Sequence, residues 1–314
     1  MSGSTAAALA AFWQGSLGSA DALLSATLVR ATPLILAGLS VALAFRAGVL
    51  NLGAEGQLLA GGAAAAAVGV ALLPALGGAT VVAALAAAAL AGALWAWTPA
   101  LLRRRGVLEV ISTLMLNFVA LYAVGYLVRG PLQEPSHAYP QSRTLAPGAR
   151  LPLLVPGTRL HLGFALALAA AAGLWWLLRG TAAGFRVRAV GLNPAAAASA
   201  GRVDVGRVTT RALLASGALA GLAGAVEVTG VTFALYDLSP GYGYTAVAVA
   251  LLAGLHPLGV VLTGVLFGAL EAGATAMQRN AGVPATLAGV VEAALVLVVL
   301  AADARRRRSA ERGT

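Results

Sequence analysis

The stretch Asn51-Leu-Gly-Ala-Glu-Gly-Gln57 sets one carboxylate, two side-chain amides and two glycines between two long hydrophobic runs. Such groups bind small polar solutes through hydrogen bonds. At membrane depth a polar, irregular segment persists only where protein buries it or where it lines a water-filled cavity. The pattern therefore predicts a transport path that includes Asn51, Gly53, Glu55 and Gln57. The alternative is a solvated turn between two helices, in which Glu55 favours a helix N-terminus.

Several other charged side chains fall inside or beside hydrophobic runs, where a charge is costly. Glu227 lies deep in its run and is a candidate for the same path. Glu109 is close to the arginines at 103–105 and is expected to reach toward them, whereas Arg30 is expected to form an ion pair with an acid. The acids available to it are Glu109, Glu227, Glu271 and Glu292.

Three polar side chains at helical spacing follow Glu109, namely Ser112, Thr113 and Asn117. They either hydrogen-bond between helices or face the path, and the sequence does not separate these roles.

A second polar segment, Tyr236-Asp-Leu-Ser-Pro-Gly-Tyr-Gly-Tyr244, follows the hydrophobic run at 212–235. Its arrangement resembles that of the first segment in mirror image, which suggests two inverted halves that meet near the middle of the membrane. This predicts that Asp237, Tyr242 and Tyr244 belong to an outer gate or docking surface. An external turn carrying aromatic residues at the membrane interface is the alternative.

Composition determines the elements that position these residues. The chain of 314 residues is 60% hydrophobic and only 10% charged, with a mean hydropathy of +0.87. A membrane-spanning helix needs about 20 mostly apolar residues. The sequence therefore predicts one all-α, polytopic transmembrane helical bundle over residues 1–314, with about 8–10 membrane segments. The long runs are 23–45, 55–75, 78–100, 107–128, 160–178, 212–235, 258–276 and 284–302, with a shorter piece at 243–256.

The basic residues predict the orientation of the bundle. The net charge is +10, and arginines cluster at the ends of hydrophobic runs, which is typical of cytoplasmic loops and not of nucleic-acid binding. The expected segments are an N-terminal interfacial stretch (1–21), an external loop (129–159), a cytoplasmic loop (179–211) and a basic cytoplasmic tail (303–314).

Residue types argue against chemistry within this chain. All basic residues are arginine, so the lysine-containing phosphate loop of ATPases is excluded, and no cysteine is present. His137, His161 and His256 are far apart, and no nucleophile motif occurs. The expectations are no catalytic residue, no metal and no cofactor bound by this chain.

The cytoplasmic segment encodes a short helix after residue 192. Asn193 is suited to cap it, Pro194 suits its first position, alanines fill two turns, and Gly201 is expected to end it in the left-handed conformation. A helix this short is marginal alone. It therefore predicts a docking partner, the alternative being an ordinary linker helix.

Together the stretches 44–57, 109–117 and 188–194 resemble permease subunits of ATP-binding-cassette (ABC) importers, across nearly the whole chain. The branch is the one that handles nucleosides, simple sugars and branched-chain amino acids. Within it, the residues of the three stretches are most similar to those of purine-nucleoside permeases. Many relatives begin with one more span, so the N-terminus departs from the pattern.

The resemblance implies a second permease subunit in a homo- or heterodimer, two cytoplasmic ATPase subunits that bind the ATP, and an external solute-binding lipoprotein or periplasmic binding protein. Membrane lipid surrounds such a bundle. The short helix then looks like a coupling helix seated on the ATPase, and the residues assigned to it are Arg188, Gly191, Asn193, Pro194, Ala197 and Gly201. A secondary transporter or channel is the competing class, but such a protein needs no ATPase dock.

Overall fold

The computed structural model describes residues 5–72, 77–201, 203–236 and 241–282, together with 284, 286, 289, 290, 293 and 294. The regular elements among them are helices, which confirms the predicted polytopic helical bundle. They are α1 (Thr5–Ser16), η1 (Ala22–Thr27), α2 (Leu28–Arg46), α3 (Ala54–Ala71), η2 (Gly77–Ala79), α5 (Thr80–Arg104), α6 (Glu109–Arg129), η3 (Pro147–Ala149), α7 (Gly163–Gly180), α8 (Ala182–Leu192), α9 (Pro194–Gly201), α10 (Val205–Val226), η4 (Glu227–Thr232), α11 (Tyr242–Leu252) and α12 (Pro257–Ala281).

Seven helical stretches in the described part of the chain are long and apolar enough to cross a membrane. They match the predicted runs from 23–45 to 258–276, while most of the run at 284–302 lies outside the described residues. The sixth stretch begins at Val205, seven residues before the predicted run. It starts there because the Asp204 side chain accepts a hydrogen bond from the Arg207 amide at 2.9 Å and so caps α10.

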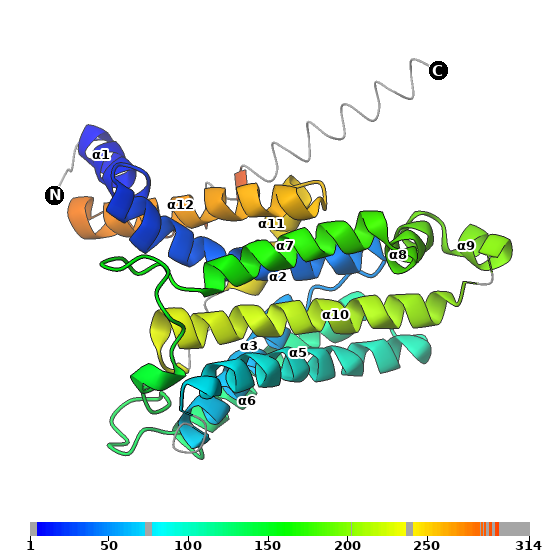
Figure 1. Ribbon diagram of the computed structural model, residues 1–314, viewed down its shortest axis with the longest axis horizontal. Helices are drawn as coiled ribbons and strands as arrows, with labels where there is room; N and C mark the ends of the chain where they lie inside the picture. Colours follow the sequence, from blue (N-terminus) through cyan, green and yellow to red (C-terminus); the bar gives the residue numbers. More distant parts are fainter. Residues whose placement is uncertain are drawn as a thin grey trace.

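Helix α10 lies at the centre of the bundle and packs against α2, α3 and α5 (Figure 1). Glycines make these contacts close. A Cβ at Gly217 or Gly221 would collide with the backbone of α5 at Gly92 or Ala88, and one at Gly224 would collide with the backbone of α3. These glycines therefore form a close-packing surface between the helices.

The packing also relates the two halves of the chain. Helix α10 packs against α3 and α5, and α2 packs correspondingly against α11 and α12, while α2 and α10 run in opposite directions (Figure 1). This exchange of partners is the arrangement that inverted repeats produce.

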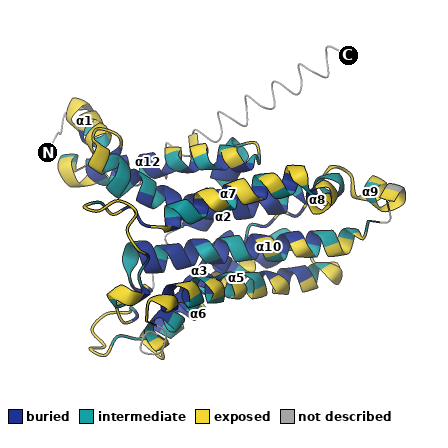
Figure 2. Cartoon of the chain, in the orientation of Figure 1, coloured by how far each residue is buried: buried dark blue, intermediate teal, exposed yellow. Residues whose placement is uncertain are grey.

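Burial separates an inner group of helices from an outer one. Helices α2, α3 and α10 are mostly buried, whereas α5, α6 and α7 present large exposed apolar side chains (Figure 2). Helix α1, part of the predicted interfacial stretch, lies along α12, where the Phe12 ring covers Gly273. The polar segments of interest lie at the ends of the inner helices.

Candidate functional site

The segment 51–57 forms a buried hydrogen-bonded network with α10. The Asn51 amide nitrogen donates to Gln57 Oε1 at 2.9 Å and to Ser216 Oγ at 2.9 Å, and Gln57 Nε2 donates to Asn51 Oδ1 at 3.1 Å. Ser216 in turn lies 2.9 Å from Ser40 Oγ of α2. These four side chains, called the polar network below, are almost inaccessible to solvent. They join the start of α3 to α2 and α10.

Glu55 links two helix N-termini. Its carboxylate, in the first turn of α3, accepts hydrogen bonds from the amides of Gly241 at 3.2 Å and Gly243 at 2.6 Å, at the start of α11. Gly243 is packed so tightly that a Cβ there would collide with the Glu55 backbone. Both N-termini carry partial positive charge, and the carboxylate between them offsets it.

The polar residues of α6 have different roles. Ser112 and Thr113 both donate to the Glu109 carbonyl of their own helix, at 3.1 and 2.7 Å. Asn117 instead reaches α3, because its oxygen accepts from the Gly56 amide at 2.8 Å and its nitrogen donates to the Leu52 carbonyl at 2.9 Å. Asn117 thus satisfies the irregular backbone of the segment, whose residues are buried by protein in this conformation.

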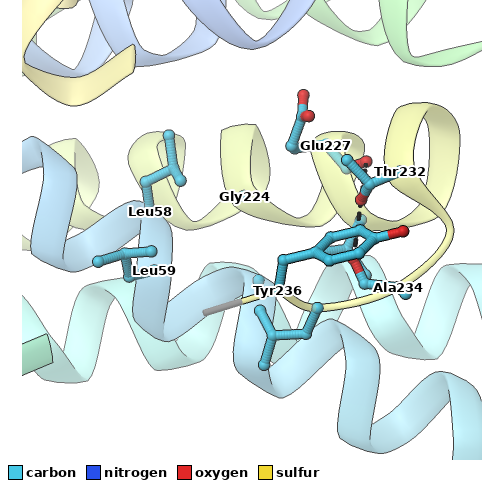
Figure 3. A pocket seen from close by; sticks show the side chains of 10 residues that line it. Leu58, Leu59, Gly224, Glu227, Thr232, Ala234 and Tyr236 are labelled. Carbon is cyan, nitrogen blue, oxygen red and sulfur yellow. Dashed lines mark hydrogen bonds between the residues drawn. The ribbon is translucent and has the colours of Figure 1, made fainter. Parts of the chain in front are cut away.

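Glu227 begins the π-helix η4, where α10 ends. Its Oε2 atom is inaccessible to solvent and has no hydrogen-bond partner. The backbone on one side of η4 borders a cavity lined also by Leu58, Thr232 and Tyr236. Figure 3 shows the Glu227 carboxylate on the opposite side of the η4 backbone from Tyr236, so it points into the bundle. A π-helix at such a position is typical of functional sites.

Arg30 does not form the predicted ion pair with Glu109, Glu227 or Glu271. It donates instead to Thr275 Oγ1 of α12 at 3.4 Å, and it remains close enough to Glu227 and Tyr242 to influence their charge states. The fourth candidate acid, Glu292, lies outside the described residues, so an ion pair with it stays a prediction. Glu109 does pair with Arg103 at 3.6 Å, as predicted.

Tyr242 and Tyr244 differ in exposure. Tyr242 is the first residue of α11 and is buried, whereas Tyr244 is 49% exposed. Asp237 and Glu292, and the arginines of the predicted basic tail, lie outside the described residues.

The loop at 129–159, which was predicted to be external, contacts the segment that follows Glu227. Backbone amides of Ser142, Leu145 and Leu151 donate to the carbonyls of Leu235, Phe233 and Thr229 at 2.7–2.9 Å. The Arg150 guanidinium also lies 4.4 Å from the centre of the Phe233 ring. A movement of this loop would therefore be transmitted to η4.

His161, just before α7, is buried with neither ring nitrogen hydrogen-bonded. Its ring fills a slot in which a Cβ at Gly163 or Gly230 would lie 2.7 Å from a ring atom. Desolvation, followed by the charge of Arg159, lowers the pKa of His161 to about 4.

His256 instead caps α12, accepting from the Gly259 amide at 3.3 Å. In the described part of the chain no cluster of three potential metal ligands occurs.

At the other end of the bundle, the predicted short helix is present as α9. The Asn193 side chain accepts from the Ala196 amide at 3.0 Å, and Pro194 is the first helical residue, as expected. Gly201 was predicted wrongly: it is the last helical residue and does not adopt a positive φ. Most of α9 is exposed, although Ala197 is half-buried.

Sequence reasoning missed the close contact between α8 and α2, called the seam below, which connects α9 to the polar network. Helix α8 precedes α9, and its Gly191 packs so closely on α2 that a Cβ would collide with the Arg46 carbonyl oxygen. The Arg46 guanidinium donates to the Leu255 carbonyl, beyond the end of α11, at 2.7 Å. Arg188 lies near enough to Arg46 for their charges to repel each other. The glycine at 191 was the only local signal of this close approach.

Comparison with known proteins identifies the family. The family model described as "Branched-chain amino acid transport system / permease component" matches residues 23–300. The chain belongs to this permease family. Among its relatives, a guanosine ABC transporter permease protein of Bacillus subtilis is 40% identical over 320 residues, which cover 96% of this chain and 88% of the relative.

Two further relatives are named for different solutes, glucose and nucleosides. A glucose ABC transporter permease protein of Haloferax volcanii is 39% identical over 90% of this chain and 77% of its own. A nucleoside ABC transporter permease protein of Lactococcus lactis subsp. cremoris is 32% identical over 90% of this chain and 80% of its own. No solved structure matches. The permease is a multi-pass membrane protein, and its family implies partner ATPases and solute-binding proteins in general.

Proposed function

We propose that this permease is the membrane-spanning subunit of an ABC importer that carries nucleosides across the cytoplasmic membrane. In this proposal it binds no ATP, two cytoplasmic ATPases drive it, and an external binding protein delivers the solute to a dimer of permease subunits. In this proposal α9 is cytoplasmic because arginines cluster near its end of the bundle, and the C-terminus, which lies outside the described residues, is cytoplasmic because of the arginines at 305–308. The relatives that carry guanosine and nucleosides support the cargo.

The observation that carries this proposal is the continuous contact from α9 to the polar network. Helix α9 is short, capped and largely exposed, which suits a docking element. Its neighbour α8 packs through Gly191 on the backbone of Arg46. Five residues after Arg46 the chain enters the polar network at Asn51, and Glu55 then holds α11. Movement of α9 would therefore reach both α3 and α11, the helices that begin at the candidate path.

The candidate path lies between the N-termini of α3 and α11 on one side and Glu227 on the other. In the conformation described, the polar network, Gly53, Asn117 and Glu55 are buried and paired, so the path is closed there. We assign Tyr242 and Glu227 to the same path because both side chains lie in the bundle interior near Arg30. Opening requires that the two helix N-termini separate.

The proposal is tested by uptake into proteoliposomes that contain this permease with its partner subunits and binding protein. Labelled nucleosides, simple sugars and branched-chain amino acids are compared with and without internal ATP. Nucleoside uptake that requires ATP and the binding protein is the expected result. The same requirements with a sugar alone would retain the importer and change its cargo, an outcome that the glucose-permease relative makes the second candidate. Uptake by the permease alone would refute the importer mechanism.

A further inference from the structure

An apolar groove opens between α7, α8 and α10, on the side of the bundle away from the cavity of Figure 3. Its apolar lining consists chiefly of Leu43, Leu177, Val187, Val208, Ala212 and Ala215. Side chains of this kind accommodate a hydrocarbon chain as well as they accommodate protein.

Two arginines line the groove as well, Arg186 from α8 and Arg211 from α10. Both are exposed, and neither has an ion-pair or hydrogen-bond partner among the described residues. By contrast, Arg103 pairs with Glu109 and Arg207 with Asp204. Two unpaired guanidinium groups beside an apolar groove are complementary to a phosphate that carries acyl chains.

The position of the groove along the bundle fits a membrane lipid. Helix α7 ends at Gly180, so Arg186 lies just past the end of a spanning helix, where headgroups are expected. Trp176 is 62% exposed on the last turns of α7, and the Arg179 guanidinium lies 5.7 Å from the centre of the Trp175 ring. Tryptophan and arginine at a helix end mark the membrane interface.

We infer that this groove binds an anionic phospholipid, with its phosphate between Arg186 and Arg211 and an acyl chain against Leu177, Val187 and Val208. This site is distinct from the solute path and does not depend on which solute is carried. Because the lipid would lie between α8 and α10, it would also brace the base of α9. A lipid whose headgroup has net negative charge is expected to bind more tightly than a zwitterionic one.

The test is native mass spectrometry of the purified full-length permease titrated with phosphatidylglycerol, phosphatidylcholine or inorganic phosphate. Phosphatidylglycerol is expected to bind more tightly than phosphatidylcholine, and Arg186→Gln and Arg211→Gln are each expected to weaken it about fivefold. Arg105→Gln, which removes the same charge beyond the end of α5, is the matched control and should bind as the wild type does. Ala215→Trp fills the groove without changing charge and should also weaken phosphatidylglycerol, which keeps the test valid if an arginine variant misfolds.

Equal binding of the two lipids, or wild-type affinity in both arginine variants, would overturn the inference. Competition by inorganic phosphate with no effect of Ala215→Trp would assign the arginines to a soluble anion instead. Loss of ATPase binding in Arg186→Gln with unchanged lipid affinity would assign them to an acidic surface of the partner.

Discussion

The carboxylate of Glu55 accepts a hydrogen bond from the amide of Gly243 at 2.6 Å, across the junction where α3 and α11 begin. Two helix N-termini meet there, and their partial positive charges would repel each other without an anion between them. The segment is therefore not a solvated turn: the buried Glu55 carboxylate joins the two helix N-termini, and this contact is called the joint below. Any conformational change that opens the path at this level has to break or move this joint.

Replacing Glu55 with Gln keeps the side chain's shape and removes its charge. Hydrogen bonds to a charged group contribute about 1.5–3 kcal/mol, so Glu55→Gln is expected to destabilise the fold by an amount in that range. The measurement is thermal unfolding in detergent, with the wild type as the reference. A melting temperature equal to that of the wild type would contradict the role of Glu55 between the two helix N-termini.

Unlike Glu55, Glu227 is expected to contribute to uptake and not to the stability of the fold. One of its carboxylate oxygens is buried without a partner, which is a cost to the fold. Glu227→Gln should therefore leave the melting temperature unchanged or raise it, while uptake falls by about an order of magnitude if the carboxylate serves the path. Thermal unfolding and uptake are measured on the same preparation. Glu109→Gln, whose partner is the half-exposed Arg103, is the control; full uptake in Glu227→Gln would remove Glu227 from the path.

The local features of this fold could be predicted from the sequence, and the long-range ones could not. Asn193 and Pro194 define a helix start by their own chemistry, and the apolar runs define the spans by length. The bond from Asn51 to Ser216 joins residues 165 positions apart, and nothing near either residue indicates its partner. For the same reason the sequence predicted that Asn51 belongs to a transport path but gave no sign of the partners that its amide has in the structure.

Gly191 tests the seam between α8 and α2. A methyl group there would collide with the Arg46 carbonyl oxygen, so Gly191→Ala forces the two helices apart. Overpacking of this kind costs about 1–3 kcal/mol. The expected result is ATP hydrolysis with reduced uptake, measured together in proteoliposomes. Gly173→Ala in α7 is the control because a Cβ there would meet no atom within 4 Å; equal coupling in both variants would exclude the contact between α8 and α2.

Helix α9 supplies a direct test of docking. If α9 is the coupling helix, a bulky charged residue at position 197, as in Ala197→Glu, is expected to uncouple ATP hydrolysis from uptake. The structure shows Ala197 half-buried and Ala198 exposed. Ala198→Glu therefore tests the docking surface with less risk to the fold, and it should reduce uptake without changing the melting temperature. Unchanged ATP-driven uptake in both variants would refute α9 as the coupling helix. Ala138→Glu, at an exposed position in the loop at 129–159, is the control for an added charge.

His161 predicts how stability depends on pH. Its pKa is about 4 in the folded protein, whereas an unfolded histidine has a pKa of about 6.5, so the unfolded state binds the proton first as the pH falls. The stability from neutral, buried His161 is complete above about pH 6.5 and is lost progressively toward pH 4, by at most roughly 3 kcal/mol. Melting temperatures measured across this range should fall in the wild type and fall less in His161→Leu. His137→Ala, in the exposed loop, should retain the wild-type slope, and equal slopes in all three proteins would show that another group senses the pH.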